Sequence, residues 1–436
     1  MTPQEPAWNA ALDALPDHCD VLVVGAGPAG SACAQVLARA GWQVVLADAQ
    51  RFPREKTCGD GLVPDTHAAL QRLGLLAEVL AEARTVPIAR CVAPSGQHVD
   101  VPGELAVLPR RRLDAILCAG AVAAGAQMVA PARLLRPLRD PAGRVNGAIL
   151  AAGGAERTVH CRWLVLATGA AASPIEALGL CERRSPSGMA LRAYIQLPGL
   201  REAVPGLQFT WHGRLRGGYG WVFPGPDDTY NVGVGILDGR HRDAADGDDA
   251  PNLRQLFERF TEVDPIAARL VREGRMLGGL KGAPLRCDLD GAGWSAPGVL
   301  VVGDAVGATY AFSGEGIGKA METGMAAADA LLAHSAPQGA DAGQADPSAA
   351  PDRVPTEAED ARVAADYRTR LEAIRPKFEM YRRATSFNRW PWLLNLVVWR
   401  ASHSPRIQRG LAEILAERKL AGSLLSWRGL RRMVLG

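Results

Sequence analysis

The chain has 436 residues, 48% of them hydrophobic and 22% charged, and a formal net charge of +3. This length and composition are typical of a globular protein with one large or two interlocked domains, and they exclude a chain that is disordered throughout. The small net charge and the lack of a recognisable RNA- or DNA-binding motif argue against a nucleic-acid partner.

The N-terminal tail, residues 1–17, lacks the basic and apolar regions of a signal peptide. The eight cysteines show no CxxC pair and no metal-ligand spacing, so we expect reduced thiols in a cytoplasmic protein and no metal site. The longest strongly apolar segment near the C-terminus, Trp390 to Trp399, is about half the length that spans a bilayer. We therefore do not expect an integral membrane protein.

Residues 20–48 predict a strand, a tight turn, a helix and a second strand. The apolar run Val21 to Val24 is typical of a buried parallel strand, and a GxGxxG pattern follows it directly. In this pattern the glycines allow the turn, the approach of a pyrophosphate and close helix packing, and an acid ending the second strand accepts hydrogen bonds from ribose. The predicted dinucleotide contacts are Gly25, Gly27, Pro28, Ala29, Gly30 and Asp48. A purely structural unit is the alternative.

Residues 217–236 read GGYGWVFPGPDDTYNVGVGI and predict a β-hairpin with its turn at Pro226 to Asp228. Tyr219, Trp221 and Phe223 alternate along the first strand, which places them on one face of a sheet. An aromatic face of this kind either packs in the core or lines an apolar substrate cavity.

Residues 298–331 predict another apolar strand, a loop rich in small residues and a long helix that begins near Gly316. Asp304 at the strand end can accept hydrogen bonds from the ribityl hydroxyls of a flavin. A helix N-terminus beside the pyrimidine edge stabilises the negative charge of a reduced flavin. These features predict FAD as the dinucleotide, with contacts from Gly303, Asp304, Gly314, Gly316 and Ile317.

The C-terminal part begins with residues 335–360, which are rich in Pro, Gly, Ala and Asp and predict a flexible linker. Ala361 to Arg383 predict a helix. From Arg400 to Gly436 there are eight arginines or lysines against two glutamates. This basic region, preceded by Trp390 and Trp392, indicates either a helical cap lying against an anionic membrane surface or a solvated helix packed on the domain.

Three separated motifs resemble those of a known family. They are PREKTCGDG (Pro53 to Gly61), GGYGWVFP (Gly217 to Pro224) and FSGEGIGKAMETG (Phe312 to Gly324). Together with the GxGxxG pattern and the downstream GDA, they make the chain similar to the p-hydroxybenzoate-hydroxylase-like flavoproteins and, within them, to the geranylgeranyl reductase family. The resemblance covers the chain from about Asp20 to Leu332.

The resemblance implies that the PREKTCGDG loop, stiffened by Pro53, lies beside the isoalloxazine ring and forms part of the substrate cavity. It adds the cofactor contacts Lys56, Cys58, Gly59, Arg110 at the pyrophosphate, and Gly169. It also implies a substrate pocket formed by Tyr219, Trp221, Phe223 and Pro224. Cys58, Tyr219 and Trp221 are then the candidate catalytic residues, while a buried structural thiol is the alternative for Cys58.

Two departures from related patterns limit what the resemblance implies. Flavin hydroxylases usually carry Asp-Gly, which helps to bind FAD and NADPH, where this chain has Thr168 and Gly169. Flavin-dependent halogenases carry Trp-x-Trp-x-Ile-Pro, where this chain has Tyr219 and Phe223 in place of the first Trp and the Ile. The second departure weighs against halogenation.

The predicted fold class is α/β (α+β), with a discontinuous Rossmann-like FAD domain and an inserted, mostly antiparallel substrate sheet. The expected divisions are a tail (1–17), the first part of the FAD domain (18–180), the substrate sheet (181–285), the second part of the FAD domain (286–334), a linker (335–360) and a helical C-terminal region (361–436).

The predicted function is an FAD-dependent oxidoreductase that reduces carbon–carbon double bonds of a hydrophobic, isoprenoid or polyketide-like small molecule. NAD(P)H or another reductant, including an electron-donor protein, would supply the electrons. A flavin-dependent monooxygenase or halogenase of the same fold is one alternative. An electron-transfer flavoprotein that reduces a quinone is the other.

Overall fold

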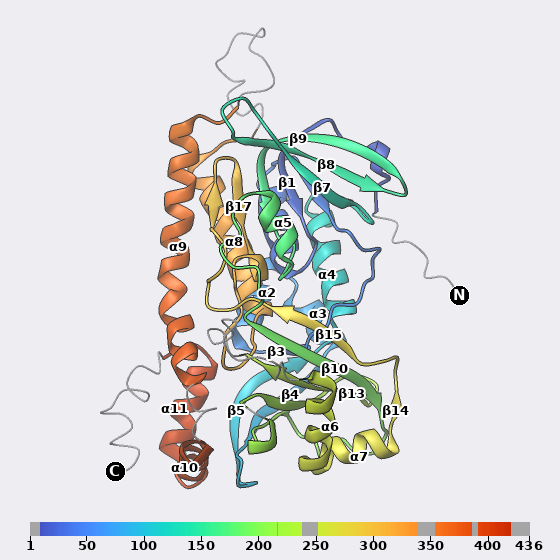
Figure 1. Cartoon of the computed structure of the whole chain (residues 1–436), viewed down its shortest axis with the longest axis vertical. Helices are drawn as coiled ribbons and strands as arrows, with labels where there is room; N and C mark the ends of the chain where they lie inside the picture. The colour runs from blue at the N-terminus through green and yellow to red at the C-terminus, as the bar shows by residue number, and fades with distance from the viewer. Residues whose placement is uncertain (1–8, 216, 238–251, 338–353, 386–390, 420–436) are drawn as a thin grey trace.

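The computed structural model describes residues 9–215, 217–237, 252–337, 354–385 and 391–419. Within these residues the strands form two sheets that lie one above the other in Figure 1. The predicted α/β class is confirmed. Parts of the predicted linker and basic tail, residues 338–353 and 420–436, lie outside the described residues.

The first sheet contains the predicted strand–turn–helix–strand unit. Its strands run in the order β16 (Ser295–Ala296), β17 (Val299–Val301), β9 (Ala155–Leu166), β1 (His18–Val24), β2 (Val44–Ala47) and β6 (Gln127–Val129). Strand β1 pairs in parallel with β2 and β9, so it is central and fully paired. Strand β8 (Val145–Ala152) pairs antiparallel with β9, and β7 (Arg133–Arg139) pairs antiparallel with β8.

Helices cover the first sheet. They include α1 (Pro28–Arg39), α4 (Arg110–Ala123), α5 (Ala172–Ala177) and α8 (Ile317–His334). Helix α9 (Glu357–Ala384) confirms the predicted helix and runs along one side of the molecule beside α8 (Figure 1). Two contacts fasten it: the Tyr367 hydroxyl donates to the Val301 carbonyl at 2.6 Å, and Arg144 pairs with Asp360 at 2.8 Å.

The second sheet is mostly antiparallel, as predicted. Its order is β14 (Arg275–Met276), β10 (Gly188–Gln196), β13 (Thr229–Ile236), β12 (Tyr219–Pro224), β11 (Leu207–Thr210), β4 (Arg84–Val92), β5 (His98–Val107) and β3 (Gly61–Leu62), with β15 (Lys281–Leu285) on β10. The sheet is wider than the stretch 181–285 expected for it. It takes β3, β4 and β5 from the part assigned to the FAD domain, because β11 pairs in parallel with β4.

The two faces of the second sheet are covered differently. Helices α6 (Leu253–Val263) and α7 (Pro265–Glu273) pack on the face that carries Tyr230, Val232 and Val234. Helices α10 (Pro391–Ser402) and α11 (Pro405–Leu415) contact β5 and pack with the aromatic face. Helices α2 (Pro64–Leu73) and α3 (Leu76–Glu82) lie between β3 and β4 in sequence and contact α8 and α4 respectively.

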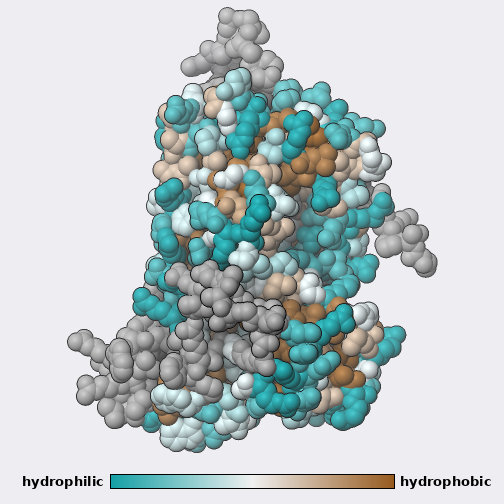
Figure 2. Space-filling view, in the orientation of Figure 1, coloured by the Kyte–Doolittle hydropathy of each residue, from teal (hydrophilic) through white to brown (hydrophobic). Residues whose placement is uncertain are grey.

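The face of the molecule in Figure 2 is largely hydrophilic, with hydrophobic atoms gathered in an upper and a lower patch. Large apolar side chains that remain exposed include Leu135, Val271, Met276, Trp392 and Trp399. None of the helices in the described ranges is long and apolar enough to cross a bilayer.

Candidate active site

The glycine-rich turn after β1 has the geometry that its pattern predicts. Gly25 has φ +108°, and a Cβ there would lie 2.2 Å from the carbonyl oxygen of Ala167, which directly follows the neighbouring strand β9. A Cβ on Gly30 would lie 1.8 Å from the Gly25 oxygen. Both positions therefore require glycine for the turn and for the packing of α1.

Gly27 is different, because a Cβ there would meet no protein atom closer than 3.5 Å. The nearest atoms are Nη2 of Arg54 at 3.5 Å and Nη2 of Arg110 at 3.8 Å. Two guanidinium groups and the N-terminus of α1 thus face the half-buried backbone of Gly27. This arrangement suits a pyrophosphate, whose negative charges both features stabilise.

Two carboxylates hold these arginines in place. Asp114, fully buried in α4, accepts a hydrogen bond from Arg110 at 2.6 Å and forms an ion pair with Arg54 at 2.9 Å. Asp48 lies 3.3 Å from Arg54 and also accepts from the Ala26 amide at 2.9 Å. Sequence reasoning identified Arg110 but missed Arg54, although Arg54 belongs to the PREKTCGDG motif.

The downstream motif folds over the same turn. A Cβ on Gly303 would lie 2.9 Å from Cβ of Ala29 in the first turn of α1. Asp304 accepts from the Thr309 hydroxyl at 2.7 Å, and α8 begins directly after Gly316. Pro28, Ala29 and Ile317 are buried at these two helix starts.

Two observations show that these residues can hold FAD. The first is the open backbone at Gly27. The second is the buried hydroxyl of Thr168, which lies next to the Gly25 turn and has no hydrogen-bond partner among the described residues. Gly169 follows it with φ +73°. An unpartnered buried hydroxyl is costly unless a ligand satisfies it, so this position can serve cofactor binding without the Asp-Gly pair.

The first motif loop meets the aromatic strand. A Cβ on Gly59 would lie 3.0 Å from Cε2 of Phe223 and 3.6 Å from Nε1 of Trp221. At the other end of the row, a Cβ on Gly314 would lie 2.6 Å from the Tyr219 hydroxyl, which donates to the Ser313 carbonyl at 2.7 Å. The aromatic row therefore spans the distance between the two loops that the resemblance places at the flavin.

The rings of this row form a continuous apolar layer. Phe209 packs edge-on against Phe223 at 5.0 Å, and Trp211 stacks on Phe312 at 5.6 Å. Leu394 and Val398 of α10 join the same cluster. Tyr219, Trp221 and Phe223 share one face, as predicted, while their role as a substrate pocket, with Pro224, stays a prediction.

A buried polar network that sequence reasoning missed fixes the first loop. Asp60 is fully buried with φ +68° and accepts from the Tyr194 hydroxyl at 2.5 Å and from the Asn231 amide at 2.7 Å. Asn231 also donates to the Cys58 carbonyl at 2.7 Å and accepts from the Trp221 indole at 2.9 Å. Burial raises the pKa of Asp60 to about 6. The only sequence signal was a polar Asn within an apolar strand.

Cys58 and Lys56, both predicted at the cofactor, differ in their surroundings. Burial raises the pKa of the Cys58 thiol, while the positive charge of Arg110 opposes the shift. The thiol is therefore protonated at neutral pH. Lys56 is half-buried and has no hydrogen bond or ion pair in the described part of the chain.

A buried lysine joins the start of α8 to the C-terminal region. Lys319, in the first turn of α8, is 1% exposed and lies 2.6 Å from Glu322, 2.8 Å from Glu417 and 3.4 Å from Asp65. Glu417 follows α11 and also accepts from the Tyr310 hydroxyl at 2.8 Å. The C-terminal region is thus fastened by charge to the helix whose N-terminus faces the predicted flavin.

Glu315 lies in the loop directly before α8, and its pKa is shifted. Burial, together with the charges of Asp65 and Glu417, raises the pKa of Glu315 to about 8, although Lys319 opposes the shift. Its carboxyl group is therefore mostly neutral at pH 7. A neutral carboxyl at this position can donate a hydrogen bond, which a carboxylate cannot.

The variant Glu315→Gln should change how stability depends on pH. A pKa raised on folding favours the folded state at low pH, and this contribution is lost as the pH rises from about 4.5 to 8. The variant should therefore gain stability relative to the parent over that range, by at most about 5 kcal/mol. Urea unfolding at several pH values measures the difference. A difference that does not vary with pH contradicts the assignment.

Comparisons with known proteins agree on a flavoprotein. The FAD binding domain family matches residues 18–234. The menaquinone reductase of Mycolicibacterium smegmatis is 35% identical over 72% of this chain and 76% of its own length. Digeranylgeranylglycerophospholipid reductase 2 of Methanopyrus kandleri is 30% identical over 71% of this chain and 76% of its own.

Two solved structures share the fold. A geranylgeranyl bacteriochlorophyll reductase-like protein from Thermoplasma acidophilum superposes with a TM-score of 0.73 at 21% identity, over 94% of this chain and 98% of that one. A flavin-dependent brominase superposes with a TM-score of 0.68 at 18% identity, over 96% and 98%. At these identities the two structures support the fold and leave the reaction open.

Proposed function

Because the chain belongs to the geranylgeranyl reductase family of FAD-dependent oxidoreductases, we propose that it reduces carbon–carbon double bonds of a hydrophobic, isoprenoid-type substrate. The observation that carries the proposal is the aromatic row between the Cys58 loop and the Gly314 loop. An apolar layer there suits a substrate without charges near the reacting carbons. NAD(P)H or another reductant, including a donor protein, would supply the electrons.

The chemistry requires a hydride on one alkene carbon and a proton on the other. When bound, reduced FAD supplies the hydride. The proton comes from a side chain or from a bound water, and the candidate side chains differ in how well they can donate it. Tyr219 already donates its hydroxyl hydrogen to Ser313, and burial raises its pKa, so it is a poor acid. Cys58 keeps a protonated thiol and is the better candidate, with a bound water as the alternative.

Trp221 has a positioning role in this proposal. Its indole N–H donates to Asn231, which in turn holds the Cys58 carbonyl and the Asp60 carboxylate. The aromatic row thereby fixes the loop that carries the thiol. A proton donor needs this kind of fixed position to reach a single substrate carbon.

The variant Cys58→Ser should keep FAD bound but slow the reoxidation of reduced flavin by an isoprenoid alkene about a hundredfold or more. Serine is nearly isosteric but far less acidic. Cys91→Ser is the control, because Cys91 on β4 is also a partly buried free thiol but packs against the aromatic cluster, whereas Cys58 packs against a separate apolar cluster that includes Leu62 and Ile317. We expect only a few-fold change there. A few-fold loss in Cys58→Ser would indicate that the thiol shapes the site, and unchanged turnover would exclude it as the donor.

Quinone reduction is the second candidate, because one of the relatives is named a menaquinone reductase. Anaerobic reduction of the flavin, followed by addition of an alkene, a quinone or oxygen, separates the candidates by reoxidation rate. Alkene reduction adds two hydrogens to the product mass. An added oxygen or halogen would instead support a monooxygenase or halogenase, and quinone-only reoxidation would overturn alkene reduction.

We also propose a peripheral contact with an anionic membrane surface through α10. Trp392 and Trp399, seven residues apart on this helix, are 62% and 42% exposed. Arg400 and Arg406 follow in the same region. Exposed tryptophans beside basic residues are typical of helices that lie in a membrane interface.

The double variant Trp392→Ala/Trp399→Ala should therefore reduce co-sedimentation with anionic lipid vesicles at least about fivefold, because both indoles lose their place in the interface. Neutral vesicles should bind the parent chain more weakly. Equal sedimentation of parent and variant would contradict the contact.

A further inference from the structure

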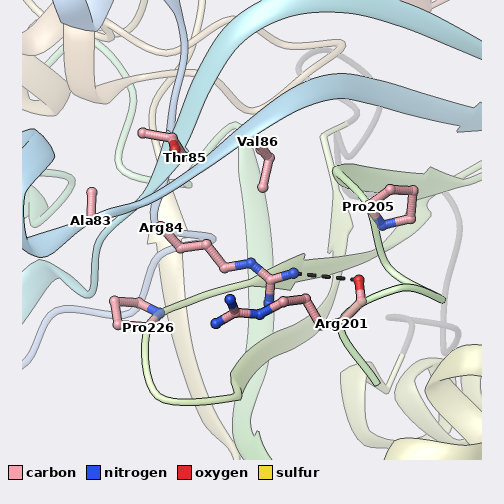
Figure 3. Close-up of a pocket in the computed structure, with 7 residues that line it drawn as sticks. All are labelled: Ala83, Arg84, Thr85, Val86, Arg201, Pro205 and Pro226. Carbon is pink, nitrogen blue, oxygen red and sulfur yellow. Dashed lines mark hydrogen bonds between the residues drawn. The ribbon is translucent and has the colours of Figure 1, made fainter. Parts of the chain in front are cut away.

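A pocket opens where β11 stops short of the start of β4. Strand β11 begins at Leu207, opposite Ala89, so residues 84–88 of β4 have no β11 partner. The chain leading into β11 and the turn between β12 and β13 surround the gap (Figure 3). The pocket has a volume of about 490 Å³, within the range of small-molecule sites. Its lining residues are Ala83, Arg84, Thr85, Val86, Arg201, Pro205 and Pro226.

Two arginines dominate this pocket. Figure 3 shows the side chains of Arg84 and Arg201 extending into the same space. Arg84 uses Nη2 for long hydrogen bonds to the carbonyls of Arg201 (3.5 Å) and Val204 (3.4 Å). Its Nη1 is buried and has no hydrogen-bond partner in the described part of the chain. A buried guanidinium nitrogen without a partner is costly, so the site is incomplete as it stands.

The surroundings support a ligand with negative charge. No carboxylate is among the residues that line the pocket. Burial raises the pKa of the Tyr230 hydroxyl, which lies beside Arg84. The close approach and charge of the Arg84 guanidinium are the main opposing causes, the charge of Arg201 opposes the shift as well, and the charge of Asp228 adds to it. The positive charges of both arginines therefore reach the Tyr230 hydroxyl, where Asp228 is the one negative charge that acts against them.

We propose that this pocket binds the phosphate group of a small molecule, held by Arg84 and Arg201. Paired guanidinium groups match the oxygens of a phosphate better than a single positive charge does. The pocket shares no residue with the predicted FAD cradle, so a phosphate here is additional to the FAD pyrophosphate. Two sources have the required chemistry: the 2′-phosphate of NADPH and the diphosphate of an isoprenyl compound.

The test measures binding of inorganic pyrophosphate to the full FAD-loaded chain by calorimetry. FAD already occupies its own pyrophosphate site, so saturable binding of added inorganic pyrophosphate reports on this pocket. Arg201→Gln should weaken it about tenfold or more, and Arg84→Gln should do the same. Arg275→Gln is the matched control, because Arg275 is exposed on β14 of the same sheet and pairs only with Gln196 among the described residues. It should change the affinity less than about twofold.

Competition experiments show which of the two compounds supplies the phosphate group. Displacement of pyrophosphate by NADPH but not by NADH assigns the phosphate to the reductant, and displacement by an isoprenyl diphosphate assigns it to the substrate. Either result supports the site. No saturable binding at millimolar pyrophosphate, or equal binding by the parent and both arginine variants, overturns it. Because no turnover is measured, this outcome is independent of whether the chain reduces alkenes.

Discussion

The variant Lys319→Met is expected to lower the free energy of unfolding by about 3–5 kcal/mol. The Lys319 ammonium is almost fully buried and pairs with Asp65, Glu322 and Glu417. Methionine fills a similar volume but removes the one cation that Asp65, Glu322 and Glu417 share, and among the described residues only Glu417 keeps another, Lys377 at 2.5 Å. Removing one partner of a buried charge cluster costs this much because the remaining charges lose their compensation. Urea unfolding of the FAD-loaded protein measures the change.

Two further variants make this test specific. Lys281→Met removes a lysine whose pair with Glu55 is about half exposed, and it should cost less than about 1 kcal/mol. Adding Glu417→Gln to Lys319→Met should restore part of the loss, since it removes one of the three crowded carboxylates, although Glu417 also pairs with Lys377. A loss below about 1 kcal/mol in Lys319→Met, or no coupling in the double variant, would mean that the cluster does not hold the C-terminal region.

The parts of the fold that the sequence predicted are those encoded by local patterns. Val21 to Val24 and the glycines after them specify a strand and a turn within a few residues of each other, and the structure has β1 and α1 there. The hairpin turn at Asp227 and Asp228 is equally local, because both residues adopt positive φ. The start of α8 after Gly316 follows from the same kind of signal.

The parts that were missed depend on contacts between distant segments. Asp60 and Asn231 lie 171 residues apart in sequence, and Lys319 and Glu417 lie 98 apart. No periodicity relates such positions, and without the fold neither burial nor partner can be deduced. The inclusion of β3 to β5 in the second sheet has the same cause, since the parallel pairing of β4 with β11 joins segments far apart.

Arg54 shows how the candidate site itself was only partly predictable. The resemblance predicts that the motif loop forms one wall of the site, with Cys58 and Lys56 among its cofactor contacts. The structure instead directs Arg54 toward Gly27 and pairs it with Asp48 and Asp114. Which cation of a loop faces a ligand depends on the path of the backbone, and the sequence carries no direct signal for that.

The variant Gly27→Ala should bind FAD more than about a hundredfold more weakly while keeping the fold. A Cβ at this position meets only the ends of Arg54 and Arg110, at 3.5 and 3.8 Å, and the backbone has φ −79°, which alanine adopts readily. The methyl group would, however, occupy the space between the turn and these guanidinium groups, where the pyrophosphate is expected. Losing two charge-assisted hydrogen bonds costs about 3 kcal/mol or more, which is over a hundredfold in affinity.

The comparison with other glycines separates binding from folding. Gly25→Ala should lose folded protein altogether, because its Cβ would lie 2.2 Å from a neighbouring backbone oxygen at a strained φ. Gly213→Ala should change neither property, since nothing lies within 4 Å of its Cβ. Flavin fluorescence titration and thermal unfolding of the FAD-free protein measure the two effects. If Gly27→Ala binds FAD as the parent does, the pyrophosphate does not lie between this turn and the two arginines.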